Sequence, residues 1–528
     1  MPDVHDHESL SFGDALFLYL EREGMPLHIA SVAVFDGPIP LGAFTRFIAS
    51  KLPLVPRYQQ RVVAPPLNLG LPAWDYDPDF DVHNHIRQAV LKRGTDVEFK
   101  AVAAQILSST LDRRRPLWEL TLVRGLQGNR TGLVIRMHHC LADGLAGIGI
   151  MNALMDTSPV APPIPKPAPI HPTPERRAAP ALLDSLVTSC FSAVQQVLTA
   201  HSELLTVGQR MVAAAGKQPE QHATQLGGNG NSHQQLPFLD ELGRLVPELA
   251  APAERLPFNV ICRGPQKFHW AEIPVAEIKA VKQACGTTFN DVALAAMTLA
   301  VRRYAESHDV QLRRRSLRIV VPVNVRGQND VSVLGNRITF LPVSIPLDIS
   351  KPEELLAAVC ERMTHLKGAH LAELVGFAGT LLGTIPSALQ ALLGPIASQL
   401  PLSFCNLIFT NVCGPAEPLY LLGHKMLACY PYVPIGGEMG MNVAVLTYNG
   451  VAYFGFTGDV HAVPDLRRFE KLLTASFVDL KKAAGVPVQP KRIRKKSEPA
   501  VKPVSTAPAA PAAPEEPLPP PLTKTAVA

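Results

Sequence analysis

Two adjacent histidines, His138 and His139, are followed by Asp143 and Gly144 in the stretch RMHHCLADGLAGIGI. A neutral imidazole accepts a proton from a hydroxyl or amine near pH 7, because its ordinary pKa lies close to that pH. A nearby carboxylate such as Asp143 can orient the ring directly, or can pair with a cation and brace the loop. The spacing therefore indicates general-base chemistry, with the second histidine as the base for an acceptor that attacks a thioester directly.

These residues lie between a predicted strand and a predicted helix. The segment TGLVIRM (131–137) is rich in residues that favour strands, and apolar residues of LAGIGIMNALMD recur at every third position. Such a junction holds side chains rigidly at the edge of a cleft, and Gly144 would allow a backbone conformation that other residues resist. Because side chains alternate along a strand, one histidine should be structural, and we assign that role to His138.

A metal site is the alternative interpretation of two histidines and an aspartate, since zinc and non-haem iron use such ligands. The nearest further candidates, His28, His83 and His85, are distant in sequence, so we expect no metal. The eight cysteines form no CxxC pair, and the acidic N-terminus has no signal-peptide core. These features are typical of a reducing, cytoplasmic chain without structural disulfides.

The formal net charge of +5 is concentrated in the C-terminal tail. Residues 491–528 contain seven Lys or Arg and three Glu, so the rest of the chain is nearly neutral. We therefore expect no nucleic-acid partner. The run KRIRKK (491–496) is either part of a solvated tail or an anchor for an anionic membrane.

The 528 residues exceed a single-core domain, and strands alternate with helices in two regions. We expect an α/β protein with four parts. Residues 1–156 form an N-terminal lobe that carries the histidine motif, and residues 157–255 form a Pro-rich linker and helical crossover. Residues 256–486 form a C-terminal lobe, and residues 487–528 form a disordered Pro- and Ala-rich basic tail. Two lobes joined by a long crossover create a cleft between them.

Residues 374–416 contain no Asp, Glu, Lys or Arg. The stretch is long enough to span a membrane, but Pro386, Pro395 and several polar residues interrupt it. This pattern favours two short buried or interfacial helices. The composition suits a hydrophobic acceptor channel or a membrane contact, and it also suits a protein core.

The motif HHCLADG resembles the HHxxxDG signature of the CoA-dependent acyltransferase superfamily, which includes chloramphenicol acetyltransferases and peptide-synthetase condensation domains. Further motifs are similar, in the same order, to those of the bacterial wax ester synthase/diacylglycerol acyltransferase family, and the resemblance covers residues 11–484. These motifs are Pro116-Leu117-Trp118, Asn290-Asp291, Gly335-Asn336-Arg337, TNVCGP at 410–415 and VPD at 463–465. Cys413 departs from the family pattern, in which proline is usual at this position.

The resemblance implies two chloramphenicol-acetyltransferase-like lobes with a substrate tunnel between them. It implies that His139 deprotonates the acceptor hydroxyl and that Asp143 braces the loop, and we add Arg326 as the partner of Asp143. Asn290 and Asp291 would shape or polarise the site. The Pro-Leu-Trp and Gly-Asn-Arg motifs are interpreted as architectural, because such residues chiefly set packing and turns.

The implied reaction transfers a long-chain acyl group from acyl-CoA to diacylglycerol or to a long-chain alcohol, with no cofactor beyond the CoA of the donor. Nothing in the residues chooses between these acceptors, and we favour diacylglycerol on the breadth of the family. The strip LRRRSLR (312–318) either contacts CoA phosphates or is a solvated surface. Two alternatives are a surface-lipid ester transferase that uses a carrier-bound acyl chain and a non-catalytic lipid-binding relative. The expected location is cytoplasmic, peripherally on the inner face of the plasma membrane or on lipid inclusions.

Overall fold

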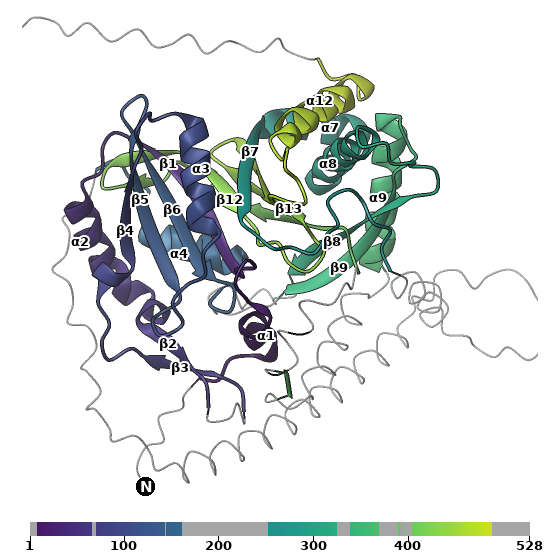
Figure 1. Ribbon diagram of the computed structural model, residues 1–528. Coiled ribbons are helices and arrows are strands. Elements are labelled where there is room, and N and C mark those ends of the chain that lie inside the picture. Colours follow the sequence, from purple (N-terminus) through teal and green to yellow (C-terminus); the bar gives the residue numbers. More distant parts are fainter. Residues whose placement is uncertain are drawn as a thin grey trace, which may run out of the picture. The chain divides into compact units, whose positions relative to one another are not determined.

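The computed structural model describes residues 8–65, 70–142, 144–160, 252–324, 338–368 and 404–487, together with residues 389, 390, 392 and 396. Most of the expected crossover at 157–255, most of the uncharged stretch at 374–416 and the tail beyond residue 487 lie outside these ranges. Met1–Pro487 belong to one compact unit. The predicted α/β class with two sheet-containing lobes is confirmed (Figure 1).

The first lobe is built on a six-stranded sheet with the order β11-β12-β1-β6-β5-β4. Neighbouring strands are antiparallel except for β4 and β5, which are parallel. The elements of this lobe are α1 (Phe12–Leu20), β1 (His28–Asp36), α2 (Leu41–Lys51), β4 (Ile86–Val90), α3 (Asp96–Leu107), β5 (Trp118–Leu126), β6 (Arg130–His138), α4 (Gly144–Leu154), β11 (Tyr420–Leu421) and β12 (His424–Tyr432). Smaller elements are the paired strands β2 (Gln60–Val63) and β3 (Ala73–Tyr76) and the 3-10 turns η1 (Leu52–Leu54), η2 (Pro56–Gln59) and η4 (Val82–Asn84).

The second lobe is built on another six-stranded sheet, with the order β7-β14-β13-β10-β8-β9. Its elements are β7 (Gln266–Pro274), α7 (Val275–Cys285), α8 (Phe289–Glu306), β8 (Ser316–Asn324), β9 (Ile338–Pro346), α9 (Pro352–Gly368), β10 (Leu407–Cys413), β13 (Met441–Tyr448), β14 (Val451–Asp459) and α12 (Arg468–Ala483). Strand β10 runs parallel to both of its neighbours. Helix α8 is buried along most of its length, because α7, α9 and α12 pack around it (Figure 1).

The division of the chain between the lobes differs from the prediction, which placed all of residues 256–486 in the second lobe. Strands β11 and β12 belong to the first sheet, where Ala30 of β1 lies opposite Tyr432 of β12. The physical reason is that β1 would otherwise end the sheet with unpaired backbone groups, and β12 pairs with that edge. Strand patterning in a sequence does not show which sheet edge a strand joins.

Local sequence signals set the elements that lead to the histidines. Ser11 caps α1 by accepting the Asp14 N–H at 3.1 Å, and Thr95 caps α3 by accepting the Glu98 N–H at 3.2 Å. A tight turn joins β5 to β6, with Asn129 in the left-handed region at φ 53°. The predicted strand before the histidines and the predicted helix after them are both present, as β6 and α4.

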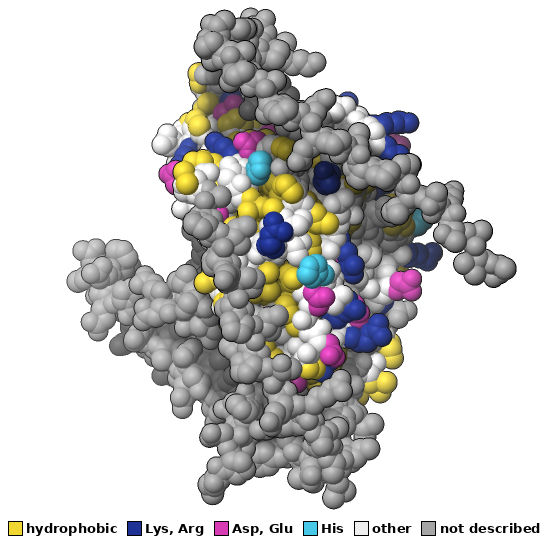
Figure 2. Space-filling view, turned by 90° about the vertical axis from the view of Figure 1, so that its left-hand side faces the viewer, with side chains coloured by type: hydrophobic (Ala, Val, Ile, Leu, Met, Phe, Trp, Pro, Cys, Tyr) yellow, Lys and Arg dark blue, Asp and Glu magenta, His cyan; other side chains and the backbone are white. Residues whose placement is uncertain are grey.

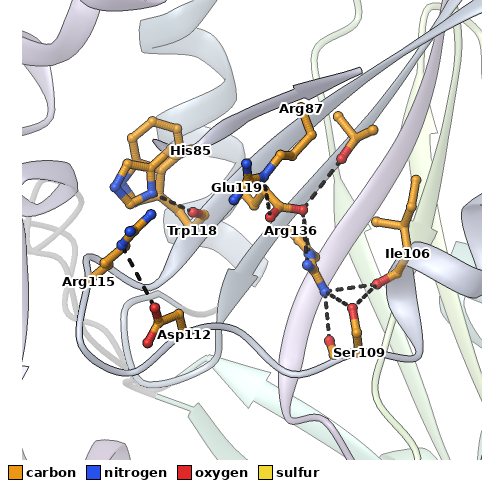
Figure 3. Close-up of polar contacts among 10 residues, drawn as sticks. His85, Arg87, Ile106, Ser109, Asp112, Arg115, Trp118, Glu119 and Arg136 are labelled. Atoms are coloured by element: carbon orange, nitrogen blue, oxygen red, sulfur yellow. Dashed lines mark hydrogen bonds and ion pairs between the residues drawn. The ribbon is translucent and has the colours of Figure 1, made fainter. Parts of the chain in front are cut away.

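Side chains along β6 alternate between the two faces of the sheet. Helix α3 covers one face and α4 covers the other (Figure 1). The positions on the α4 side line a cavity: Leu133, Ile135 and Met137. Arg136 lies on the α3 side, where it donates to the carbonyl oxygens of Ile106 at 2.8 Å and Ser109 at 2.6 Å (Figure 3). Its guanidinium also pairs with the Glu119 carboxylate at 2.9 Å. The charged network thus anchors the end of α3 without reaching the cavity.

Two surface properties bear on the expected partners. On the described part of the face in Figure 2, basic and acidic side chains are interspersed with hydrophobic ones, and no extended basic patch is visible. Within the described ranges, no single helix has the length and apolarity of a membrane span. Helices α7 and α8 meet those limits only as a pair, with a bend of 101° between them.

Candidate active site

His139 lies at the wall of a cavity, just beyond the end of β6. Its backbone N–H donates to the Leu27 carbonyl at 2.9 Å, which ties the histidine to the start of β1. Its ring stacks on the Phe17 ring of α1, with centroids 4.0 Å apart and planes 6° apart. Only 8% of the residue is exposed, and it lines the cavity. The imidazole is therefore held in one plane and remains accessible from the cavity.

His138 is fully buried, as expected for the structural member of the pair. Its N–H donates to the Leu117 carbonyl at 2.9 Å, and its Nδ1 accepts the Cys140 N–H at 3.2 Å. Because Nδ1 accepts, Nε2 carries the hydrogen, and it faces Oε1 of Glu21 at 3.6 Å. Burial lowers the pKa of His138 well below its usual value, so the ring is neutral near pH 7.

Glu21 connects the two histidines to the loop before β1. Its Oε1 accepts the Leu27 N–H at 3.0 Å, and the Leu27 carbonyl accepts the N–H of His139. Its Oε2 pairs with Arg113 at 3.0 Å, which balances the charge of the nearly buried carboxylate. This chain of contacts fixes the backbone at His139 from behind.

The cavity has a volume of about 1090 Å³ and lies between the two sheets. Strands β1, β6 and β12 and helix α4 of the first lobe line it, as do β10 and β13 of the second. Among the described lining residues, Glu438 is the single acid and none is Lys or Arg. Such a cavity suits hydrocarbon, and it strengthens electrostatic interactions by excluding water.

Gly144 and the Asn290-Asp291 pair border the site in different ways. A Cβ at Gly144 would lie 3.1 Å from Val412 Cγ2, so this glycine lets the start of α4 approach β10. Its role is therefore steric in the described geometry.

Asn411 lines the cavity and donates to the side-chain oxygen of Asn290 at 3.4 Å, so Asn290 borders the wall through that amide. Asp291 is buried, and its carboxylate accepts the N–H of Thr288 at 2.9 Å in the capping box of α8, which is a structural role.

The Pro-Leu-Trp motif has the architectural role that the sequence predicts. Trp118 is 1% exposed, and its Nε1 donates to the Tyr58 carbonyl at 2.7 Å. The carbonyl of Leu117 holds the backbone of His138. The motif therefore supports the strand end that carries the histidines.

Asp143, Arg326 and the Gly335-Asn336-Arg337 motif lie outside the described residues, so the predicted pairing of Asp143 with Arg326 stays a prediction. In the described ranges, no three His, Cys, Asp or Glu side chains form a cluster that could hold a metal ion. The arginine strip is divided, because Arg313 and Arg314 are exposed whereas Arg318 is buried.

Sequence reasoning missed Phe17, Glu21 and Asn411. Phe17 and Glu21 are distant from the motif in sequence, and only the packing of α1 beside the end of β6 brings them to it. The signal for Glu21 is a carboxylate placed directly after the apolar helix FGDALFLYL. The signal for Asn411 is its place in the TNVCGP motif at the end of β10.

Solved structures with the same architecture define the class of this fold. A wax ester synthase/diacylglycerol acyltransferase from Marinobacter aquaeolei VT8 aligns with a TM-score of 0.60 at 23% identity, covering 91% of this chain and 100% of that one. The first condensation domain of the CDA synthetase aligns with a TM-score of 0.54 at 13% identity, covering 91% and 98%. The fold is thus that of two-lobed acyltransferases and condensation domains.

Sequence comparisons then give the family. The model of the "Wax ester synthase/diacylglycerol acyltransferase catalytic domain" matches residues 10–293, and that of the "WS/DGAT C-terminal domain" matches residues 334–481. The probable diacyglycerol O-acyltransferase tgs1 of Mycobacterium tuberculosis (strain H37Rv) is 29% identical over 465 residues, which cover 86% of this chain and 91% of that protein. The chain belongs to the wax ester synthase/diacylglycerol acyltransferase family, and it is an acyltransferase.

Proposed function

We propose that this protein transfers a long-chain acyl group from acyl-CoA to a lipid hydroxyl, with His139 as the general base. The acceptor is diacylglycerol, which gives triacylglycerol, or a long-chain alcohol, which gives a wax ester. The observation that carries the proposal is the imidazole of His139 at the wall of a large apolar cavity between the lobes. Family membership supports the reaction class.

The mechanism follows from the position of this ring. A ring nitrogen of His139 takes the proton of the acceptor hydroxyl as the oxygen attacks the thioester carbonyl. The tetrahedral intermediate then collapses, the C–S bond breaks, and the imidazolium returns the proton to the departing CoA sulfur. The apolar walls limit access of water, which favours ester formation over hydrolysis. Asp143 would brace the loop, with Arg326 as its partner.

The proposal includes peripheral contact with a membrane or lipid inclusion in the cytoplasm, where both substrates concentrate. Three described residues of the uncharged stretch support this part, because their side chains are large, apolar and exposed: Leu389 (43%), Leu392 (66%) and Ile396 (54%). Each of these three residues is in a helical conformation. Large exposed apolar side chains suit insertion at a lipid surface.

The assay for this function follows the release of free thiol from palmitoyl-CoA by the purified full chain. Thiol release should require an added diacylglycerol or hexadecanol, and the matching ester should accumulate in equal amount. Comparison of kcat/KM for the two acceptors decides which one the enzyme prefers. Thiol release that is independent of either acceptor would instead identify a thioesterase and contradict the proposal.

A further inference from the structure

The cavity continues from His139 into the first lobe, beneath α4. Six residues of α4 line it: Gly144, Gly147, Ile148, Ile150, Met151 and Leu154. All of these except Ile150 are related by steps of three or four positions and share one face of the helix. At a rise of 1.5 Å per residue, this face is about 15 Å long. The cavity therefore follows α4 over nearly its whole length.

The opposite wall of this space is one face of the first sheet. Ser31 of β1 lies opposite both Ile135 of β6 and Pro431 of β12, so these three side chains share a face, and all three line the cavity. His139 lies beyond the end of β6 with the same alternation as Ile135. The imidazole is thus at one end of the space between helix and sheet.

Helix α2 forms a further part of the cavity wall. Phe44 and Ile48 of α2 line the cavity and are 0% and 2% exposed. We define the α4 passage as the part of the cavity lined by Gly147, Ile148, Met151 and Leu154 of α4 and by Phe44 and Ile48 of α2. These residues are apolar, and Phe44, Ile48, Met151 and Leu154 are buried.

We propose that the α4 passage holds the single hydrocarbon chain that is attached to the group reacting at His139. This inference rests on the proposed function. A passage with buried apolar walls disfavours a polar group, and an unbranched hydrocarbon chain fills it without leaving a polar group unpaired. Such a chain comes from one of two sources, the acyl group of the donor or the alkyl group of a long-chain alcohol.

Gly147 keeps this passage open near the imidazole. A Cβ at residue 147 would lie 3.5 Å from Ile29 Cδ1, an ordinary contact, so alanine fits. A longer side chain must enter the passage or displace Ile29. Gly149 lies on the same helix but is exposed, and a Cβ there would meet no heavy atom within 4 Å. The two glycines have similar helix propensity, so replacing either one changes the stability of α4 in a similar way. They differ in their surroundings, because Gly147 faces the passage and Gly149 faces open space.

The test uses Gly147→Leu, Gly147→Ala and the matched control Gly149→Leu, with donors from butyryl-CoA to stearoyl-CoA and a fixed acceptor. Gly147→Leu should lower the ratio of kcat/KM for palmitoyl-CoA to kcat/KM for butyryl-CoA by about 10-fold or more. Gly147→Ala and Gly149→Leu should keep the wild-type length preference. A second arm varies the alcohol from butanol to hexadecanol with a fixed donor. The arm in which the preference shifts identifies the source of the chain.

Unchanged length preference in both arms, in a Gly147→Leu protein that melts like wild type, would overturn the proposal.

Photo-crosslinking of the wild-type protein provides a test that does not depend on folding of the variants. A long-chain acyl-CoA and a long-chain alcohol, each with a terminal diazirine, should label peptides from residues 144–154 or 41–51. Labelling confined to the second lobe would overturn the passage. Absence of turnover by the wild type would instead count against the proposed function.

Discussion

At the scale of single residues, the site depends on how one imidazole is oriented. His139 has its backbone held by Leu27 and its ring stacked on Phe17, so its plane is set by α1 rather than by its own loop. A general base works only when its lone pair points at the proton to be removed. We therefore regard Phe17 as a positioning residue for His139.

Replacing Phe17 with leucine should lower kcat by about 10-fold and change KM little, because leucine keeps apolar bulk but does not hold the ring plane. Phe80→Leu is the control, since Phe80 also stacks on a histidine, His85, with centroids 5.4 Å apart. That pair does not line the cavity. Melting temperatures separate loss of alignment from loss of fold. Equal loss of kcat in both variants would contradict the positioning role.

At this scale the sequence locates a residue where the residue type is itself the signal. Adjacent histidines before an aspartate and a glycine single out His139, which lies at the cavity wall, and strand alternation separates it from the buried His138. The contacts of Phe17 with His139 and of Glu21 with His138 are different, because they arise from tertiary packing between segments more than 110 residues apart in sequence. No local pattern encodes such a contact.

At the scale of elements, strands β1 and β6 bury two histidines against each other. His28 and His138 are register partners, and both are fully buried. Burial, with a smaller contribution from the charge of Arg136, lowers the pKa of His28 to about 3. Burial likewise lowers the pKa of His138, with Arg113 and the neighbouring histidines adding to the effect. Both rings are therefore neutral in the folded protein at mildly acidic pH.

The free energy of unfolding should consequently fall as the pH drops below about 6.5 toward about 3. In this range the imidazoles of His28 and His138 bind protons in the unfolded chain but not in the folded chain. Each of these histidines contributes up to about 1.4 kcal/mol per pH unit in this range. Urea unfolding from about pH 7.5 to about pH 5 measures the slope. His28→Gln should make the slope shallower by about one proton. His83→Gln is the control, because that side chain is 76% exposed. An unchanged slope in His28→Gln would contradict this account.

At the scale of the whole molecule, the two-lobed α/β fold follows from the alternation of strand and helix patterns in the sequence. The pairing of β11 and β12 with the first sheet does not follow from it, because pairing between sheet edges is decided by long-range contacts. This pairing has a consequence for the site. Strand β12 supplies Pro431 to the cavity wall, so both halves of the chain build the site.

The surface of the whole molecule gives a test of the proposed lipid contact. Replacing Leu389, Leu392 and Ile396 with serine should weaken binding to neutral phosphatidylcholine vesicles several-fold, since apolar area drives such binding. The matched control replaces Val90 and Val97, which are exposed on the first lobe at 64% and 66%. Ending the chain after Gln489 should weaken binding only to anionic vesicles. Vesicle binding that survives all of these changes would remove the membrane contact from the proposal.

The central claim concerns the proton taken by His139, and the most direct measurement is the rate of ester formation by His139→Ala. We predict a loss of kcat of about 10²–10⁴-fold or more, with palmitoyl-CoA binding and melting temperature close to wild type. A folded His139→Ala protein that forms ester at the wild-type rate would contradict the account.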